Sequence, residues 1–329
     1  MTAVAPARPR AAAQRTPAGT AVAGVGMAVP GTVVPSSQTE ARLALAPGWI
    51  ESRTGVRERR VTAPGERLSD LAAAAGRKAL AAAEADPAEL DLVVVATVTA
   101  DEVMPNAAPV VAGALGAARA AALDVGMACS GFLGAFAMAS AWIEAGRARN
   151  ALVIGADVFS RIVDPDDRRT APLFGDGAGA CVLQAAPAPG RVGPVILRSD
   201  PSAAALVVAE RGGRMRMEGP ETYRLAVARL VEVTGEACAA AGCTTEGVDL
   251  FVYHQANARI LRAIGQRLGL DPERVAESIA RYGNTSAASI PIALAEAGAD
   301  GRLAEGTRVL MAAFGAGMTW GATLVEWGA

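Results

Sequence analysis

The amino-acid sequence predicts an α/β protein made of two related halves. Short apolar runs bounded by polar turns alternate with Ala-rich helical stretches, which is the order of elements in α/β folds. Two sequence patterns recur at one spacing, which is typical of a duplicated unit. The 329 residues are enough for a large core, and because only 4% of them are aromatic, that core must consist mainly of Ala, Val and Leu.

The duplication rests on two pairs of segments. Residues 79–95 and 237–253 both read as the end of an Ala-rich helix, a polar turn and an Asp-Leu step into a strand. Residues 151–156 and 308–313 form a second pair of apolar strands. Both pairs are separated by about 157 residues, and a shared spacing of this kind predicts two halves of about 150 residues each.

We expect the two halves to cover roughly residues 20–185 and 186–329. Residues 1–19 are rich in Ala, Pro and Arg and lack the apolar stretch of a secretory signal, so we predict a disordered tail there. Continuous apolar runs favour strands that are buried on both faces of parallel sheets. The predicted strands are Leu92–Thr97, Ala151–Ile154, Leu250–Tyr253 and Val309–Ala312, and the clearest helices between them are Gly131–Ala145 and Ile290–Ala297.

Composition excludes several classes of protein. The chain has 31 basic and 33 acidic residues, a formal net charge of −2, which argues against a general nucleic-acid binder. Four cysteines without clustering and a single histidine argue against a disulfide scaffold and a His-rich metal site. Charges or Gly and Pro interrupt every long apolar run, so no transmembrane helix is expected. We expect a cytoplasmic enzyme with reduced thiols.

Two glycine-rich stretches resemble nucleotide-binding loops only superficially. Gly24–Gly31 lacks a clean dinucleotide fingerprint, and Pro30 forbids the helix that should follow, so we predict a strand leading into a turn. Gly175–Gly179 lacks the Lys-Ser/Thr pair of a P-loop. Its glycines are expected to let the backbone approach a neighbouring group closely rather than to bind phosphate.

Cys129 is the most informative cysteine. It lies between an apolar run and the helix predicted from Gly131, where the positive end of a helix dipole favours a thiolate. From position alone, a reactive thiol and a buried structural thiol are about equally good interpretations. The other three cysteines are interpreted as structural because they lie inside apolar or Ala-rich segments: Cys181, Cys238 and Cys243.

The single histidine, His254, directly follows the predicted strand Leu250–Tyr253. Ligand sites of α/β sheets gather at the carboxyl ends of strands. A lone histidine is more often a structural residue, but this position and the polar neighbours Gln255, Asn257 and Arg259 favour a functional role.

Asn284 precedes the second predicted helix start. Its neighbour Ser286 lies 157 residues after Cys129, so the two helix starts are related by the repeat and should meet near the axis between the halves. Asn284 or Thr285 could also be an ordinary N-cap.

The turn Phe314–Gly321 can present backbone N–H groups to a developing oxyanion, or form a hairpin before a final strand at Ala322–Glu326.

Seven segments in order resemble the thiolase superfamily, and most closely the β-ketoacyl-acyl carrier protein synthase III family. The likeness begins near residue 20 and is carried by residues 48–60, 124–132, 164–168, 174–180, 253–260, 283–289 and 314–321. It implies a thiolase-like fold in which the two halves form a layered αβαβα arrangement.

The resemblance implies a catalytic triad of Cys129, His254 and Asn284. Cys129 would take an acyl group from acyl-CoA, malonyl-acyl carrier protein would lose CO₂, and the enolate would attack the thioester to give a 3-oxoacyl product. His254 and Asn284 would donate hydrogen bonds to the enolate oxygen, and the backbone N–H groups of Cys129 and Ala316 would hold the oxyanion of acyl transfer.

The resemblance also implies binding residues. Trp49, Arg53, Arg168 and Asn257 would contact CoA, and Arg224, Arg259 and Arg267 would bind the acidic carrier protein. The alternative for these arginines is a solvated helix face, and for Arg224 and Arg267 this interpretation is about as good as the functional one.

The acyl pocket would contain Met104, Phe132, Phe314 and Met318. Met104 would enter it from the partner subunit, which implies a homodimer. Acyl-CoA and phosphopantetheinyl carrier protein would be substrates, with no tightly bound cofactor, metal, nucleic acid or membrane partner.

Rival activities remain at this stage. The nearest is an acyltransferase of the same fold that moves the acyl group to a hydroxyl or amine without condensation. A thiolase is less well supported, because residues 314–321 lack a second cysteine, and Pro30 argues against a dehydrogenase. The identity of the primer does not follow from the residues.

Overall fold

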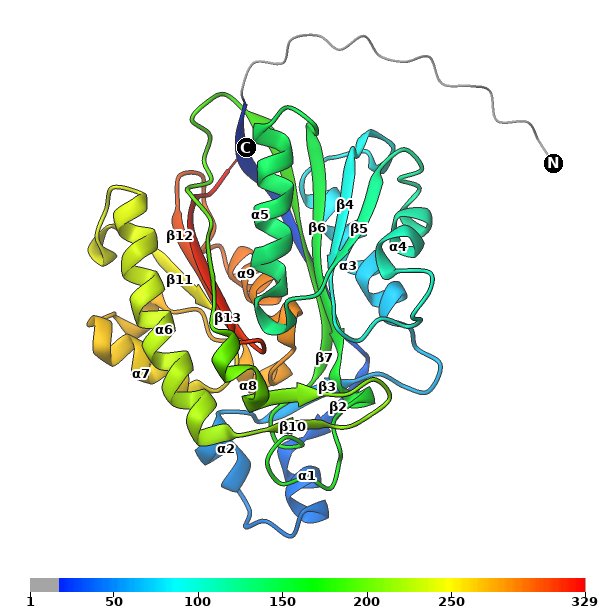
Figure 1. The fold of residues 1–329 in the computed structure, drawn as a ribbon, viewed down its shortest axis with the longest axis vertical. Coiled ribbons are helices and arrows are strands. Elements are labelled where there is room, and N and C mark those ends of the chain that lie inside the picture. Colours follow the sequence, from blue (N-terminus) through cyan, green and yellow to red (C-terminus); the bar gives the residue numbers. More distant parts are fainter. Residues whose placement is uncertain (1–17, 329) are drawn as a thin grey trace, which may run out of the picture.

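A computed structural model describes residues 18–328 of the chain (Figure 1). The tail expected over residues 1–19 lies almost entirely outside the described residues, although Gly19 already belongs to the first strand. The C-terminal end lies beside that strand, where Val22 and Gly328 form an isolated bridge.

The described residues contain two larger sheets, both of mixed direction. The first has the order β1(Gly19–Ala28), β7(Asp176–Ala186), β6(Asn150–Val158), β4(Leu92–Ala96), β5(Ala121–Val125). The second has the order β11(Leu250–Tyr253), β12(Arg308–Gly315), β13(Thr319–Glu326), β8(Ile196–Ser199). The four predicted strands are confirmed as β4, β6, β11 and β12, with ends shifted by up to four residues.

The expectation of parallel sheets is only partly right. β4 pairs in parallel with β5 and β6, and β11 pairs in parallel with β12. However, β7 runs antiparallel to β6 and β1, and β13 runs antiparallel to β12 and β8. The antiparallel strands β7 and β13 are buried over most of their length, as β4 and β6 are, so apolar content alone could not distinguish their directions.

The helices complete a five-layer αβαβα arrangement, as expected (Figure 1). The central layer holds α5(Gly131–Glu144) and α9(Ser289–Ala299), whose apolar side chains share one core with the inner faces of both sheets. Side chains alternate along β4, so Val94 faces this inner core and Val93 faces the outer core. The outer layers are α3(Leu68–Ala82) and α4(Ala107–Leu115) on the first sheet, and α6(Gly219–Ala240) and α7(Ala258–Leu268) on the second.

Smaller elements cluster at the end of the molecule where the catalytic candidates lie. The short strands are β2(Thr32–Pro35), β3(Glu58–Val61), β9(Val207–Ala209) and β10(Met215–Met217), and the short helices are α1(Ser36–Arg42), α2(Trp49–Thr54) and α8(Ile279–Tyr282). Short 3₁₀ helices occur at η1(Pro87–Glu89), η2(Ala128–Ser130), η3(Phe159–Arg161), η4(Pro201–Leu206), η5(Thr245–Gly247), η6(Pro272–Arg274) and η7(Ser286–Ala288). Within residues 18–328, every helix is too short or too polar to cross a bilayer.

Both glycine-rich stretches behave as predicted. β1 ends at Ala28 and leads through a turn to β2, without the helix that a dinucleotide fingerprint requires. A Cβ atom added at Gly175 would lie 2.3 Å from the Tyr282 carbonyl oxygen. A Cβ atom added at Gly179 would lie 2.8 Å from the Ile292 amide nitrogen. These glycines therefore let β7 pack closely against the segment that carries Asn284 and α9.

Candidate active site

The three catalytic candidates converge on one internal cavity of about 60 Å³. Cys129 comes from the first half of the chain and His254 and Asn284 from the second, and all three line this cavity. A larger surface pocket of about 600 Å³ shares the lining residues Thr222, Ala256 and Ile260 with it. The two pockets therefore adjoin, and we call the larger one the entrance pocket.

Cys129 lies in η2, immediately before α5, as the sequence predicts. The Ser286 hydroxyl donates a hydrogen bond to its Sγ at 3.5 Å, so the two positions related by the repeat do meet between the halves. Ala128 and Ser286 both have left-handed backbone conformations, with φ of 44° and 51°. Such strain is costly outside glycine and is concentrated at functional sites.

The thiol of Cys129 is not a thiolate at rest, contrary to the effect expected from the helix dipole. Burial raises its pKa to about 12, and the carboxylate of Asp157 acts in the same direction. The hydrogen bond from Ser286 opposes this shift but does not cancel it. Loss of hydration therefore outweighs the helix dipole, and the thiol must lose its proton during its attack on a substrate.

His254 follows β11 and is only 2% exposed. Its backbone N–H donates to the Ala312 carbonyl at 2.8 Å, and its Nδ1 lies 2.6 Å from the Ser289 hydroxyl. Burial lowers the pKa of the imidazole to about 3, so the ring is neutral at physiological pH. The adjacent Gln255 has a structural role, because its amide group donates to the carbonyls of Tyr253 and Ala276 and so links the two backbone segments.

Both backbone polar groups of Asn284, its N–H and its carbonyl, form hydrogen bonds. Its N–H donates to the Leu173 carbonyl at 2.8 Å, and its carbonyl accepts from the Gly175 N–H at 3.0 Å. The ordinary N-cap interpretation is wrong for α9, whose N-cap is Ala288, without a side-chain capping bond. Instead, the side-chain oxygen of Asn284 accepts from the Ser286 N–H at 2.9 Å. Since this bond occupies the amide oxygen, the NH₂ group is the part of the side chain available to a ligand.

The end of β12 brings a second backbone segment against Cys129. A Cβ atom on Gly315 would lie 2.9 Å from the Cys129 nitrogen, so only glycine permits this approach. Ala316 follows and lines the cavity. The N–H groups of Cys129 and Ala316 donate to no other group within residues 18–328, which leaves two backbone donors for an oxyanion. The hairpin interpretation also holds, since β13 begins at Thr319.

All but one of the predicted binding residues line the entrance pocket. Trp49, Arg53, Arg168, Asn257, Arg224 and Arg259 line it. The Arg53 guanidinium lies 5.9 Å from the centre of the Trp49 ring, Arg168 donates to the Leu43 carbonyl at 2.7 Å, and Asn257 caps α7. Arg267 is outside this group, on the exposed last turn of α7.

Only some of the residues predicted for the acyl pocket lie at the cavity. Phe314 and Met318 line the cavity, but Phe132 does not. Its ring is fully buried in the core between the sheets, with its centre 6.0 Å from that of Phe136. The residues that sequence reasoning missed come from several distant elements: Phe174, Val207, Met215, Ala226 and Leu230. Asp157 and Ser289 were also missed, because no local pattern reveals a buried polar contact between the halves.

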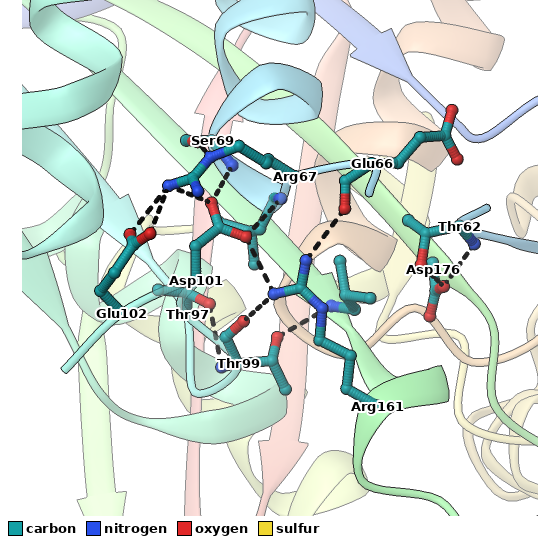
Figure 2. Close-up of polar contacts among 12 residues, drawn as sticks. Thr62, Glu66, Arg67, Ser69, Thr97, Thr99, Asp101, Glu102, Arg161 and Asp176 are labelled. Atoms are coloured by element: carbon teal, nitrogen blue, oxygen red, sulfur yellow. Dashed lines mark hydrogen bonds and ion pairs between the residues drawn. The ribbon is translucent and has the colours of Figure 1, made fainter. Parts of the chain in front are cut away.

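Met104 lies on the loop between β4 and α4 and is 83% exposed. Figure 2 shows how this loop is fastened: Asp101 accepts from the backbone N–H groups of Leu68 and Ser69 at the start of α3 and pairs with Arg161 at 2.9 Å. Glu102 pairs with Arg67 at 2.7 Å. The ion pairs hold the loop in place while its tip projects into solvent.

The neutral imidazole of His254 should make stability depend on pH. The unfolded state takes up a proton near pH 6.5, whereas the buried ring does so only near pH 3. The folded state therefore loses stability as the pH falls below 6.5, by up to about 1.4 kcal/mol per pH unit from this residue.

Urea unfolding of the native chain and of His254→Asn between pH 7.5 and 4.5 measures this effect. The free energy of unfolding should fall more steeply with decreasing pH in the native chain. Asp157, whose pKa burial raises, contributes in the opposite direction but is common to both proteins. Parallel curves would show that His254 does not carry the effect.

Family models match both halves of the chain. The model of 3-oxoacyl-(acyl carrier protein) synthase III matches residues 123–201, and that of its C-terminal part matches residues 238–327. A β-ketoacyl-acyl carrier protein synthase III from Streptomyces coelicolor is 47% identical over 94% of each chain. Another, from Rhodospirillum rubrum, is 46% identical over 93% of this chain and 98% of its own.

Solved structures agree with this result. The 3-oxoacyl-(acyl carrier protein) synthase III of Aquifex aeolicus has a TM-score of 0.91 and 40% identity, covering 94% of this chain and all of its own. The priming β-ketosynthase of a polyketide biosynthetic pathway has a TM-score of 0.91 and 34% identity, covering 95% of this chain and 98% of its own.

Proposed function

Because this chain belongs to the 3-oxoacyl-(acyl carrier protein) synthase III family of the thiolase superfamily, we propose that it primes fatty acid or polyketide synthesis. The reaction is a decarboxylating condensation of an acyl-CoA with malonyl-acyl carrier protein. The observation that carries the assignment is the convergence of Cys129, His254 and Asn284 on one cavity that opens through a cationic pocket.

In the first half-reaction, the Cys129 sulfur attacks the acyl-CoA carbonyl carbon. The tetrahedral oxyanion is held by the N–H groups of Cys129 and Ala316, which have no other acceptor among the described residues. The C–S bond to CoA then breaks, and the thiol proton leaves with the CoA sulfur. The result is an acyl thioester on Cys129.

In the second half-reaction, malonyl-acyl carrier protein loses CO₂. The electron pair of the broken C–C bond moves toward the thioester oxygen, and His254 and Asn284 donate hydrogen bonds to that oxygen. The enolate carbon attacks the acyl group on Cys129, which gives the 3-oxoacyl product and a thiolate that regains a proton from solvent. Since two neutral donors suffice for this charge, the chemistry needs no tightly bound cofactor or metal.

The entrance pocket fits the substrates' charged ends. Trp49, Arg53 and Arg168 offer an aromatic face and two cations to the nucleotide of CoA, and Asn257, which lines the same pocket, would contact the pantetheine arm. Arg224 and Arg259 line this pocket and would bind the acidic carrier protein, and Arg267, in the last turn of α7, would add a further positive charge. Arg224 also pairs with Glu221 at 2.5 Å, which reduces its share of that charge.

We also propose that the chain works as a homodimer. Val98, Val103, Met104, Leu123 and Met138 are exposed large apolar residues, and β5 is an edge strand of the first sheet. Two β5 edges can pair, and each Met104 tip can then enter the acyl pocket of the partner.

Light scattering tests this assembly. The native chain should have twice the 33.2 kDa mass of one chain, and Leu123→Lys should shift it toward the monomer. Val33→Lys, an equally drastic change at an exposed residue on β2, is the matched control and should leave the dimer intact. A native chain that is monomeric at micromolar concentration contradicts the proposal.

Intact mass spectrometry tests the reaction itself. Incubation with a panel of acyl-CoAs should produce an acyl adduct on Cys129, and subsequent malonyl-acyl carrier protein should release CO₂ and discharge the adduct. No adduct with any acyl-CoA on folded protein overturns CoA priming. An adduct that is stable to malonyl-acyl carrier protein but transfers to a hydroxyl or amine indicates the acyltransferase instead.

A further inference from the structure

One buried contact of His254 is not used by the mechanism above. Ser289, the first residue of α9, is 1% exposed, and its hydroxyl oxygen lies 2.6 Å from His254 Nδ1. The same oxygen accepts the backbone N–H of Gln255 at 3.3 Å. This hydroxyl therefore touches both the catalytic ring and the backbone that follows it.

The direction of the short bond follows from counting hydrogens. A serine hydroxyl has one hydrogen to donate, and a neutral imidazole has one nitrogen that donates and one that accepts. The Ser289 oxygen makes no third hydrogen bond within residues 18–328, so Nδ1 is the one acceptor found for its hydrogen. If Nδ1 carried the imidazole hydrogen instead, the buried hydroxyl hydrogen would have no partner, which is costly.

We propose that Ser289 is a positioning residue that holds His254 in the tautomer with its hydrogen on Nε2. This deepens the proposed function and rests on it. With Nδ1 occupied as an acceptor, the opposite edge of the ring is a hydrogen-bond donor, which is what the developing enolate oxygen requires. The resting imidazole then has no free nitrogen to take the thiol proton of Cys129, so Ser289 commits His254 to decarboxylation rather than to acylation.

The sequence makes this proposal directly measurable, because the chain contains one histidine. Protein labelled with ¹⁵N-histidine and purified without a histidine tag gives one ring, and its ¹H–¹⁵N correlations show which nitrogen carries the hydrogen. We expect hydrogen on Nε2 and a bare Nδ1 at pH 7.5 in the native chain. A hydrogen on Nδ1 overturns the proposal without the need for any variant.

Two variants test the consequence. In Ser289→Ala the single tautomer should be lost, and decarboxylation should fall about tenfold, the effect of one good hydrogen bond, while acyl-adduct formation changes less than about threefold. Ser289→Thr keeps the hydroxyl and should restore both the tautomer and decarboxylation. An unchanged tautomer in Ser289→Ala, or equal loss of both half-reactions, overturns the proposal.

Ser140→Ala is the matched control. Ser140 is a buried serine of α5 whose hydroxyl donates to Glu144 at 2.8 Å, and it does not line the cavity. It should change neither the tautomer nor the ratio of the half-reactions. Because the tautomer is read without substrate, a native chain that shows it but forms no acyl adduct refutes the proposed function and leaves the Ser289 contact standing.

Discussion

Cys129→Ala is expected to abolish the acyl adduct and to lower formation of the 3-oxoacyl product by at least about 1000-fold. Among residues 18–328, Cys129 is the only cysteine that lines the inner cavity, and the two N–H groups beside it have no covalent chemistry of their own. The donors His254 and Asn284 remain, so malonyl-acyl carrier protein should still lose CO₂ without condensation.

The measurement is intact mass after exposure to acyl-CoA, together with product and CO₂ assays. Cys243→Ser is the matched control, because Cys243 is the other half-buried cysteine and lies outside the cavity. It should behave like the native chain. If Cys129→Ala still accumulates an adduct of the same mass at the same rate, the nucleophile has been wrongly assigned.

Asn284→Asp is expected to lower the rate of decarboxylation by about 100- to 1000-fold and to leave acylation within about threefold. The substitution is nearly isosteric, and its remaining oxygen can still accept from the Ser286 N–H at 2.9 Å, so the local backbone should be kept. What is lost is the NH₂ donor, and an ionised carboxylate would oppose the negative charge of the enolate.

The loss should therefore grow with rising pH as the new carboxyl group ionises. Adduct formation and CO₂ release are measured separately over a series of pH values. Asn150→Asp, the same change at an Asn of β6 whose side chain bonds only to the Glu89 carbonyl, should leave both rates unchanged. Equal losses in both half-reactions of Asn284→Asp would remove the specific role given to Asn284.

Much of the fold could be predicted because its signals are local. The strands β4, β6, β11 and β12 are continuous apolar runs, and α5 and α9 are long stretches of good helix formers. The repeat then relates Cys129 to Ser286, and the structure confirms that these two residues meet. The single histidine and the motif positions likewise identified the side chains that line the cavity.

The chemical state of those side chains could not be predicted in the same way. A helix start favours a thiolate at Cys129, yet burial between the two halves raises its pKa to about 12. Phe132 is one residue into a helix that begins beside the site, yet its ring turns into the core. Both outcomes depend on which atoms surround the group, and those atoms come from distant parts of the chain.

The sequence by itself determined the fold class and the duplicated strands and helices, and it singled out Cys129, His254 and Asn284 as candidates. Only the tertiary structure decided the antiparallel strands, the lining from α6, β9 and β10, and the contact between Ser289 and His254. The physical reason is the distance along the chain over which each effect acts. Periodicity and residue type report on one or two turns of the chain. Desolvation, tautomer choice and cavity shape depend instead on the atoms that meet where the two halves pack together.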